Sequence, residues 1–227
     1  MIHTREDKIA LFRDRRDAGR KLAQQLTDYV GRNDVIVLAL PRGGVPVAYE
    51  VALALHAPLD IFIVRKLGLP GHEEVAIGAI ASGSVRVLNE EIVRYLNIPM
   101  ALIDGVARRE LRELERRAGA YRGNRPPPDV KGRTVILIDD GLATGASMRA
   151  AVTGLRAHSP AHIVIAVPTA APETCESFKS EVDRIVCFTT PEPFYGVSRW
   201  YENFSQTTDE EVKMLLEEAT HQSQIDK

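Results

Sequence analysis

The chain has 227 residues, of which 44% are hydrophobic and 26% are charged, the balance of a folded domain and not of a disordered or fibrous protein. At roughly 100–200 residues per domain, this length predicts a single domain over residues 1–227. Lys and Arg number 29 against 31 Asp and Glu, a formal net charge of -2, which excludes a global basic field for nucleic acid or anionic membranes.

The cysteine content and the hydropathy pattern indicate the cellular compartment of the protein. Cys175 and Cys187 are too few for a disulfide scaffold and lack the spacing of a metal site. The first residues lack the apolar core of a signal peptide, and no apolar run approaches the roughly 18 residues of a membrane helix. We therefore expect a soluble protein of the reducing cytoplasm with no membrane partner.

The first third of the chain predicts two helices that alternate with two strands. Residues 7–30 carry one apolar helical face, and residues 35–40 form a short apolar run that leads through a glycine turn into a helical pattern over 46–56. Residues 59–64 predict a second strand. Residues 67–74 contain so many glycines and prolines that they predict a mobile surface loop.

The middle of the chain predicts a hairpin and a charged helix. Residues 75–81 and 85–88 flank Ser-Gly-Ser, which favours a hairpin, and Asn89 is placed to cap a short helix that ends before Pro99. Residues 101–121 predict a solvated helix in which Glu and Arg often stand three or four positions apart. Three prolines after it indicate an internal loop.

The last part of the chain repeats the alternation of strand and helix. Such alternation predicts an α/β fold with a mostly parallel central sheet and helices on both faces. We expect strands at residues 135–138, 162–167 and 184–188. We expect three helices: one that ends near residue 157, one over residues 172–179 and one over residues 208–219.

Residues 135–147 carry the most informative motif, Val-Ile-Leu-Ile-Asp-Asp-Gly-Leu-Ala-Thr-Gly-Ala-Ser. Four apolar residues bring Asp139 and Asp140 to the carboxyl end of a strand, where open α/β sheets bind ligands. Paired carboxylates suit diol hydroxyls or a hydrated metal ion. The glycines and hydroxyls of residues 141–147, just before a helix, suit a phosphate. A sugar phosphate fits both halves; the alternative is a capped turn with exposed acids.

Three other motifs are excluded. Gly145 is followed by Ala146, so the lysine of a Walker loop is missing. Neither glycine cluster has the Gly-x-Gly-x-x-Gly spacing of dinucleotide-binding folds. No Gly-x-Ser-x-Gly elbow of a serine hydrolase occurs.

Residues 135–147 resemble the signature of the type I phosphoribosyltransferases throughout. The order of elements from about residue 9 to 188 also resembles that fold, which implies a core over this range and a small hood built from the chain termini, with an aromatic arm and helix at about 189–220. By this resemblance Asp139 and Asp140 bind the ribose 2′- and 3′-hydroxyls of phosphoribosyl pyrophosphate. Its 5′-phosphate is bound by Ala143, Thr144, Gly145, Ala146 and Ser147.

The resemblance also gives the first glycine turn a role. Members of the family carry a pyrophosphate-binding loop after the first core strand, often with an unusual cis peptide bond. Here that loop reads Pro-Arg-Gly-Gly over residues 41–44, so Arg42, Gly43 and Gly44 are the expected pyrophosphate ligands. The alternative is a plain turn before a helix that begins near Pro46.

The segment after Arg65 and Lys66 occupies the position of the family's flexible catalytic loop. Closure of such a loop would exclude water from an oxocarbenium-like ribosyl centre. His72, Glu73 and Glu74 are candidates for proton transfer there, and we take Arg65, Lys66, Glu73 and Glu74 as the catalytic set. The alternative is that each is a solvated loop residue.

The acceptor is less well defined. Enzymes that salvage 6-oxopurines usually have an acid where this chain has Ala143, and alanine resembles the adenine type. Six of the thirteen aromatic residues lie between residues 188 and 204, so Phe194 and Tyr195 are candidates for stacking on a base. The alternative is that Trp200, Tyr201 and Phe204 pack on the core or on a partner subunit.

These expectations combine into one main hypothesis, transfer of a phosphoribosyl group from phosphoribosyl pyrophosphate to a nitrogenous base. Mg²⁺ is expected to arrive with the pyrophosphate, and no protein metal site is assigned, because His158 and His162 flank a Ser-Pro break. A homodimer is expected. One alternative is a regulator on the same fold that binds nucleic acid through the Arg-rich residues 108–125, and another is hydrolysis or pyrophosphate transfer on the same donor.

Overall fold

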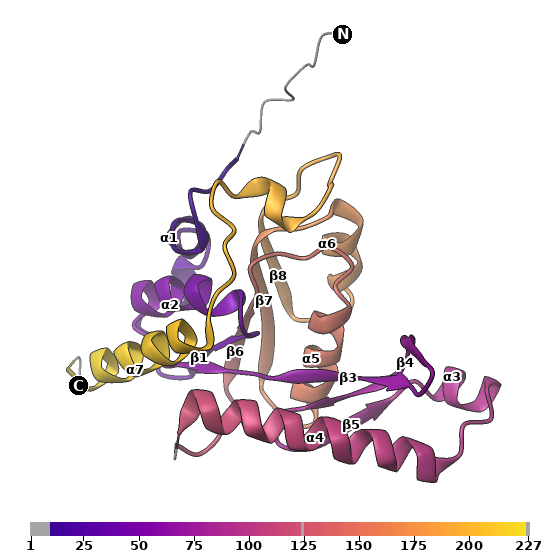
Figure 1. Ribbon diagram of the computed structural model, residues 1–227. Helices are drawn as coiled ribbons and strands as arrows, with labels where there is room; N and C mark the ends of the chain where they lie inside the picture. The colour runs from indigo at the N-terminus through magenta and orange to yellow at the C-terminus, as the bar shows by residue number, and fades with distance from the viewer. Residues whose placement is uncertain (1–9, 124, 226–227) are drawn as a thin grey trace, which may run out of the picture.

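The computed structural model describes residues 10–123 and 125–225 (Figure 1). Strands and helices alternate along most of the chain, and two short 3-10 helices, Thr27–Tyr29 and Val197–Trp200, lie outside them. The strands are β1 (Val35–Ala39), β2 (Leu59–Ile61), β3 (Val64–Leu69), β4 (His72–Ala81), β5 (Val85–Leu88), β6 (Thr134–Ile138), β7 (His162–Thr169) and β8 (Arg184–Thr189). The helices are α1 (Arg15–Ala23), α2 (Gly44–Leu55), α3 (Glu90–Tyr95), α4 (Met100–Arg122), α5 (Ala146–Arg156), α6 (Pro172–Phe178) and α7 (Asp209–Ile225).

Five strands form the central sheet, in the order β2-β1-β6-β7-β8. Every neighbouring pair in this sheet is parallel. The register pairs Val37 with Ile136 and Ile136 with Val164, so β6 lies in the middle of the sheet. This arrangement confirms the predicted α/β class with a mostly parallel sheet.

Strands β1 and β6 are buried along their whole length because helices cover both faces of the sheet. In β6, Ile136 and Ile138 belong to one buried cluster, whereas Val135 and Leu137 belong to another. Alternate residues of a strand point to opposite faces, which explains this division. Residues of α1, α2 and α7 complete the first cluster, and residues of α5 and α6 complete the second. Figure 1 shows these two helical layers on either side of the sheet.

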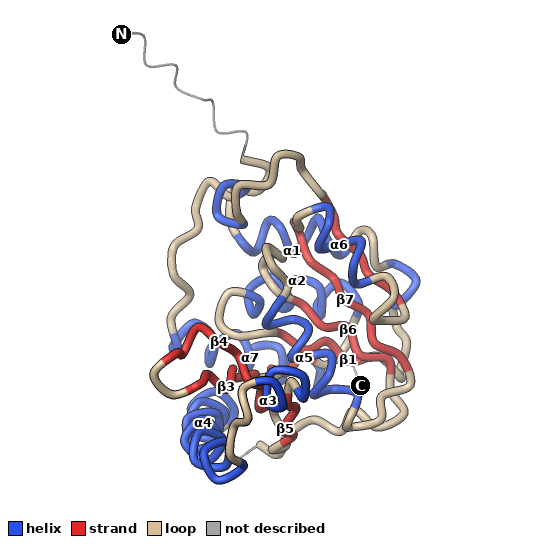
Figure 2. Tube along the Cα trace, turned by 90° about the vertical axis from the view of Figure 1, so that its right-hand side faces the viewer, coloured by secondary structure: helices blue, strands red, loops and turns tan. Residues whose placement is uncertain are grey.

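A second, antiparallel sheet of β3, β4 and β5 lies beside the first. It packs between α4 and α5 (Figure 2). The predicted hairpin of residues 75–81 and 85–88 is confirmed as β4 and β5. The predicted mobile loop at 67–74 is wrong: those residues are the end of β3, a turn at Pro70 and Gly71, and the start of β4. Leu67 and Ile77 are fully buried, so apolar packing stabilises this segment as strands.

The segment before α1 and the segment that follows Val197–Trp200 meet above the central sheet. Phe12 and Tyr201 form an isolated parallel bridge, and the backbone N–H groups of Glu202 and Asn203 donate to the carbonyl oxygens of Phe12 and Arg13. Tyr201 is 1% exposed and its ring lies 5.2 Å from that of Phe12. Tyr201 is therefore buried in a cluster with Phe12, and the division into a core and a hood from the chain termini stays a prediction. In Figure 1 the indigo and yellow segments run side by side there.

Side-chain caps mark the start of three helices, α1, α3 and α7. The Asn89 side chain accepts a hydrogen bond from the N–H of Ile92 at the start of α3, and the Thr208 hydroxyl accepts one from Glu211 at the start of α7. The first helix is shorter than predicted at both ends: Asp14 caps the start of α1, and α1 ends at Ala23, after which Thr27–Tyr29 forms a separate 3-10 helix. Residues 7–9 of the prediction lie outside the described residues.

The two cysteines differ from the sequence expectation. Cys175 of α6 and Cys187 of β8 form a disulfide across 12 positions of sequence, although their number and spacing indicated no disulfide role. The fold places them together because α6 packs next to β8. Among the described residues, no helix has the length and apolar character needed to span a membrane.

Candidate sugar-phosphate site

The two adjacent acids lie at the carboxyl edge of the central sheet. Strand β6 ends at Ile138, so Asp139 and Asp140 stand in the turn, and the N–H of Asp140 donates to Asp139 Oδ1 at 2.8 Å. Neighbouring strand residues would point to opposite faces, but residues in a turn are released from that rule. Both carboxylates can therefore serve one ligand.

The glycine turn of residues 41–44 lies directly against these acids. A Cβ atom on Gly43 would come within 2.1 Å of Asp140 Oδ2, and one on Gly44 would come within 3.3 Å of Asp139 Oδ1. Only glycine leaves room for such an approach. The peptide bond between Pro41 and Arg42 is cis, as the family resemblance implies. The fold thus brings the predicted pyrophosphate loop to the predicted diol acids.

Arg42 faces a carboxylate from the C-terminal helix. Its Nη1 atom lies 3.6 Å from Asp209 Oδ1, and the same oxygen accepts a hydrogen bond from the Tyr121 hydroxyl at 2.6 Å. Burial, with the hydrogen bond to Asp209, raises the pKa of Tyr121 to about 12. Two helices that are distant in sequence, α4 and α7, therefore meet beside the predicted pyrophosphate loop.

Burial dominates the electrostatics of the two acids. It raises the pKa of Asp139 well above its usual range, and the neighbouring Asp140 charge adds to that rise. The pKa of Asp140 is also raised by burial, but the guanidinium of Arg15 opposes the shift. The site is costly to ionise without a ligand that donates hydrogen bonds to it.

The predicted 5′-phosphate loop leads into the N-terminus of α5. Gly145 has φ +71° and precedes the helix, a conformation that glycine adopts without strain. Ala143, Thr144, Ala146 and Ser147 are exposed. Their side chains and N–H groups are accessible to an anion at a helix N-terminus, where the helix dipole favours negative charge.

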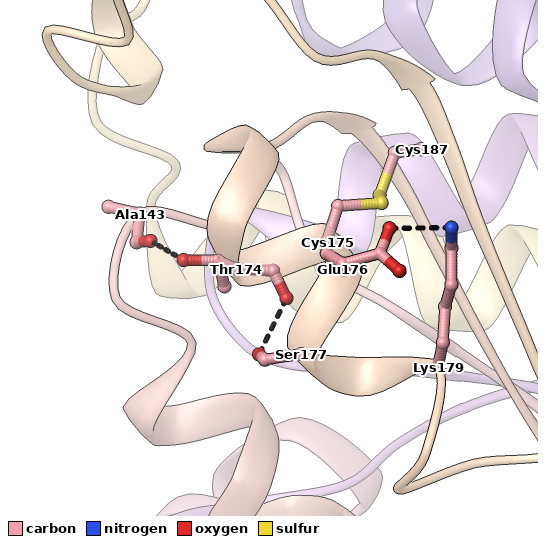
Figure 3. Close-up of a disulfide and its surroundings, with 7 residues drawn as sticks. All are labelled: Ala143, Thr174, Cys175, Glu176, Ser177, Lys179 and Cys187. Atoms are coloured by element: carbon pink, nitrogen blue, oxygen red, sulfur yellow. Dashed lines mark hydrogen bonds and ion pairs between the residues drawn. A yellow bond between two sulfur atoms is a disulfide. The ribbon is translucent and has the colours of Figure 1, made fainter.

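Helix α6 supports this loop from behind (Figure 3). The Thr174 hydroxyl donates to the Ala143 carbonyl at 2.6 Å, and a Cβ on Gly145 would collide with Phe178 and Thr174. Arg149 of α5 donates to the Thr144 carbonyl at 3.1 Å and pairs with Glu181. The loop conformation is therefore fixed by packing and by side-chain hydrogen bonds.

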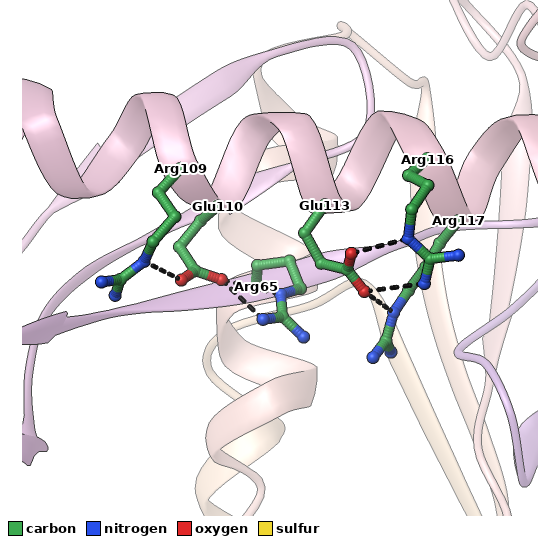
Figure 4. Close-up of polar contacts among 6 residues, drawn as sticks. All are labelled: Arg65, Arg109, Glu110, Glu113, Arg116 and Arg117. Atoms are coloured by element: carbon green, nitrogen blue, oxygen red, sulfur yellow. Dashed lines mark hydrogen bonds and ion pairs between the residues drawn. The ribbon is translucent and has the colours of Figure 1, made fainter.

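The predicted catalytic residues lie on the β3–β4 hairpin. Arg65 does not stand free: its guanidinium donates twice to Glu110 of α4, at 2.9 and 2.6 Å (Figure 4). Lys66 and Glu73 are exposed, and the N–H of Gly71 donates to Glu73 and lowers the pKa of its carboxyl. Glu74 lies in β4, and its side chain is outside the described residues. The described contacts of Arg65 and Glu73 therefore join the hairpin to itself and to α4, and not to the two acids.

The predicted stacking pair lies in the segment that follows β8. The ring of Phe194 is stacked on that of Trp200, with centroids 6.5 Å apart, and Tyr195 is 70% exposed beneath the guanidinium of Arg199. Val197 of the same segment sits against Gly141, where a Cβ would meet its methyl groups. This aromatic segment therefore borders the signature turn, and base stacking stays a prediction.

Sequence reasoning missed two side chains of this site. Arg15 of α1 pairs with Asp140 across 125 positions of sequence, and the Tyr201 hydroxyl donates to the Asp140 carbonyl oxygen. Tyr201 had a signal in the aromatic cluster near the C-terminus. Arg15 had none, because one arginine on a charged helix is indistinguishable from its neighbours Arg13 and Arg16.

Comparison with known proteins decides the family. A family model described as phosphoribosyl transferase domain matches residues 11–196, which contain the acids, both loops and the hairpin. The chain belongs to the phosphoribosyl transferase family. The predicted resemblance is therefore confirmed.

Several relatives of this family member are similar in sequence or structure. A "putative phosphoribosyl transferase" of Mycobacterium tuberculosis H37Rv is 47% identical over 93% of the chain. The chain spans only 47% of that relative. A crystal structure of TT1426 from Thermus thermophilus is 43% identical, with a TM-score of 0.81 over 91% of this chain and 98% of that one. The "bifunctional protein PyrR" of a Roseiflexus species is 28% identical over 71% of the chain and 70% of its own length.

Proposed function

We propose that this protein transfers the 5-phosphoribosyl group of phosphoribosyl pyrophosphate to a nitrogen atom of a heterocyclic base. A bond forms between the acceptor nitrogen and C1 of the ribose, while the bond from C1 to the pyrophosphate oxygen breaks and pyrophosphate leaves with the electron pair. The observation that carries the proposal is the direct contact of Gly43 and Gly44 with Asp140 and Asp139.

The three parts of the donor have matching groups at this edge. The carboxylates of Asp139 and Asp140 would accept hydrogen bonds from the ribose hydroxyls. The N–H groups and hydroxyls of residues 143–147 would bind the 5′-phosphate. Arg42, with the backbone of Gly43 and Gly44, would bind the pyrophosphate, after Arg42 exchanges Asp209 for the ligand. Binding and alignment of this kind supply much of the rate of transfer reactions.

Mg²⁺ fits this scheme as a companion of the substrate. The described residues contain no group of three or more His, Cys, Asp or Glu side chains that could hold a metal ion. Mg²⁺ commonly keeps several waters and binds substrate phosphates. We propose that pyrophosphate oxygens and water hold the ion, which offsets the charge of the leaving group.

The proposal also assigns roles to the β3–β4 hairpin and to the aromatic segment after β8. Lys66 and Glu73 are exposed on the hairpin and would act on the leaving group or on a proton of the acceptor after the hairpin approaches the donor. Phe194 and Tyr195 would stack on the base. The cytoplasm and a homodimer are proposed as setting and assembly, and fractionation and light scattering test them.

The decisive experiment measures pyrophosphate release from phosphoribosyl pyrophosphate and Mg²⁺ with a panel of purine, pyrimidine, pyridine and imidazole acceptors. We expect release that requires one acceptor. Release without any acceptor would indicate hydrolysis instead. Calorimetric binding of the donor without release would favour a regulator that binds nucleic acid. Against a regulator, glutamates of α4 already pair with Arg109, Arg116 and Arg117 in the Arg-rich residues 108–125.

A further inference from the structure

The guanidinium of Arg15 lies inside the candidate site. Its Nε atom is 2.8 Å from Asp140 Oδ2, and the side chain of Arg15 is only 11% exposed. Arg15 stands in the first turn of α1, which Asp14 caps. A buried charge pair with this geometry places one fixed positive charge beside two adjacent acids.

Arg15 also binds the C-terminal arm. Its Nη1 atom donates to the Ser205 carbonyl at 2.7 Å, and its guanidinium carbon lies 3.9 Å from the ring centroid of Phe204. The position of a Cβ on Gly43 is 3.3 Å from Arg15 Nε. One side chain from α1 thus contacts the pyrophosphate loop, the diol acid and the arm.

These contacts orient the carboxylate of Asp140 and leave one of its oxygens able to accept hydrogen bonds from a ligand. Arg15 engages Oδ2, and an ionised carboxylate accepts several hydrogen bonds through its two oxygens, so Oδ1 retains acceptor capacity. The Tyr201 hydroxyl donates to the backbone carbonyl of the same residue. Side chain and backbone of Asp140 are therefore both fixed by residues from outside the signature.

We propose that Arg15 is a positioning residue of the sugar-phosphate site, orienting the Asp140 carboxylate toward the ribose hydroxyls and linking that orientation to the C-terminal arm. The inference rests on the proposed function, since it needs Asp140 to bind the diol. It assigns a role in donor binding to a residue that lies far outside the signature motif.

The test is calorimetric titration of the full chain with ribose 5-phosphate. We expect Arg15→Gln to weaken binding by about 10- to 100-fold, because it removes a charge-assisted hydrogen bond to the binding carboxylate. Arg15→Lys keeps the charge and should recover most of the affinity. Arg16→Gln is the matched control, since Arg16 is on the same helix but pairs with Glu50 and lies over Tyr49, and it should bind as the wild type does.

A double-mutant cycle separates positioning from a structural role. If Arg15 acts through Asp140, Arg15→Gln should cost far less affinity in an Asp140→Asn background than in the wild type. An equal cost in both backgrounds would overturn the inference, as would wild-type affinity in Arg15→Gln. If Arg15→Gln does not fold, Arg15→Met, which also removes the charge and the hydrogen bond to Asp140, replaces it in both backgrounds. Absence of ribose 5-phosphate binding by the wild type would instead contradict the proposed function.

Discussion

At the scale of single residues, the site combines two neighbouring carboxylates with burial, an arrangement that opposes folding stability. Burial raises the pKa of Asp139, which means that its charged form is destabilised in the ligand-free protein. Arg15 opposes the shift of Asp140 directly, but its effect on Asp139 is the smallest of the causes that act there. Donor hydroxyls would supply the missing hydrogen bonds.

Because burial destabilises the charged form of Asp139 while the proposed ligand requires its oxygens, we expect Asp139→Asn to have opposite effects on stability and on binding. A carboxyl with a raised pKa holds its proton in the folded state while the unfolded chain releases it above about pH 3.9, so the free energy of unfolding falls as pH rises toward the folded pKa. The amide has no such dependence. We expect the variant to unfold at higher denaturant than the wild type at pH 7 and to bind ribose 5-phosphate more weakly.

Asp183→Asn provides the control of opposite sign. The N–H of Ile163 donates to Asp183 and lowers the pKa of its carboxyl, so its charge stabilises the fold above the unfolded pKa and the variant should be less stable at pH 7. Urea unfolding of both variants between pH 4 and pH 8 measures the signs. An Asp139→Asn protein less stable than the wild type at pH 7 would contradict the argument.

At the scale of elements, the β3–β4 hairpin shows how tertiary packing changes a loop into strands. Gly68 and Gly71, which indicated a loop, have specific places: Gly68 allows the backbone of Glu73 to approach within 2.8 Å of its Cβ position, and Gly71 has φ +82° in the turn. Leu67 is covered because β3 lies under α4. Turn residues alone do not reveal how long the flanking strands are.

The ion pair between Arg65 of the hairpin and Glu110 of α4 gives a further prediction. Glu110 is 8% exposed and pairs with Arg65 through Oε2 and with Arg109 through Oε1. Arg65→Gln leaves Oε2 without its cation, so it should lower the free energy of unfolding by about 1–3 kcal/mol, discounted for the partial exposure of Arg65 and for the remaining pair with Arg109. Arg116→Gln removes an exposed pair with Glu113 on the same helix and should cost about 0–1 kcal/mol. Chemical denaturation compares the two. Equal costs would show that burial of Glu110 does not matter.

The same Arg65 variant tests the catalytic assignment. At a temperature where both proteins are folded, a loss of turnover in Arg65→Gln with donor affinity retained would support a role of Arg65 in catalysis. Unchanged turnover would assign Arg65 to the packing of the hairpin on α4. Arg116→Gln serves again as the reference.

The disulfide between α6 and β8 predicts a redox dependence of stability. It closes a loop of 12 positions, and bonds of this kind typically contribute about 2–4 kcal/mol. Replacing Cys175 and Cys187 by Ala should lower the free energy of unfolding by that amount under oxidising conditions. A thiol reductant should destabilise the wild type equally and leave the double variant unchanged. A wild type whose stability does not change with the reductant would contradict this prediction. Disulfides are rare in reducing compartments, so the cytoplasmic localisation stays a prediction.

At the scale of the whole molecule, one ligand would connect segments from the entire chain. The proposed donor site draws on the loop after β1, the loop after β6 and, through the contact of Arg15 with Ser205, on α1 and the segment before α7. Binding to the folded state alone should stabilise all of them together. At 100 times its Kd, ribose 5-phosphate should add about 2.7 kcal/mol and raise the Tm by roughly 5–11 °C.

Thermal unfolding with ribose 5-phosphate, and with ribose as the control that lacks the phosphate, checks this expectation. Ribose should have little effect at the same concentration, and Asp139→Asn should respond less to ribose 5-phosphate than the wild type. A shift that is the same for both sugars would show that the phosphate loop of residues 143–147 takes no part in binding.

The family, the α/β class and the positions of both loops could be predicted from local sequence patterns. Short apolar runs mark buried parallel strands, and the two acids followed by a glycine loop mark a strand end that meets a helix. These signals are local: each can be recognised within about a dozen residues, as in residues 135–147. The prediction failed for the hairpin at 67–74, where packing by distant helices outweighs local turn residues.

The distant residues that border the candidate site could be identified only from the three-dimensional structure. Arg15 reaches Asp140, Thr174 supports Ala143, and Cys175 reaches Cys187 through contacts between elements that no sequence period records. The physical reason is that an ion pair or hydrogen bond is set by side-chain geometry within about 3 Å, whereas sequence patterns report only burial and backbone conformation.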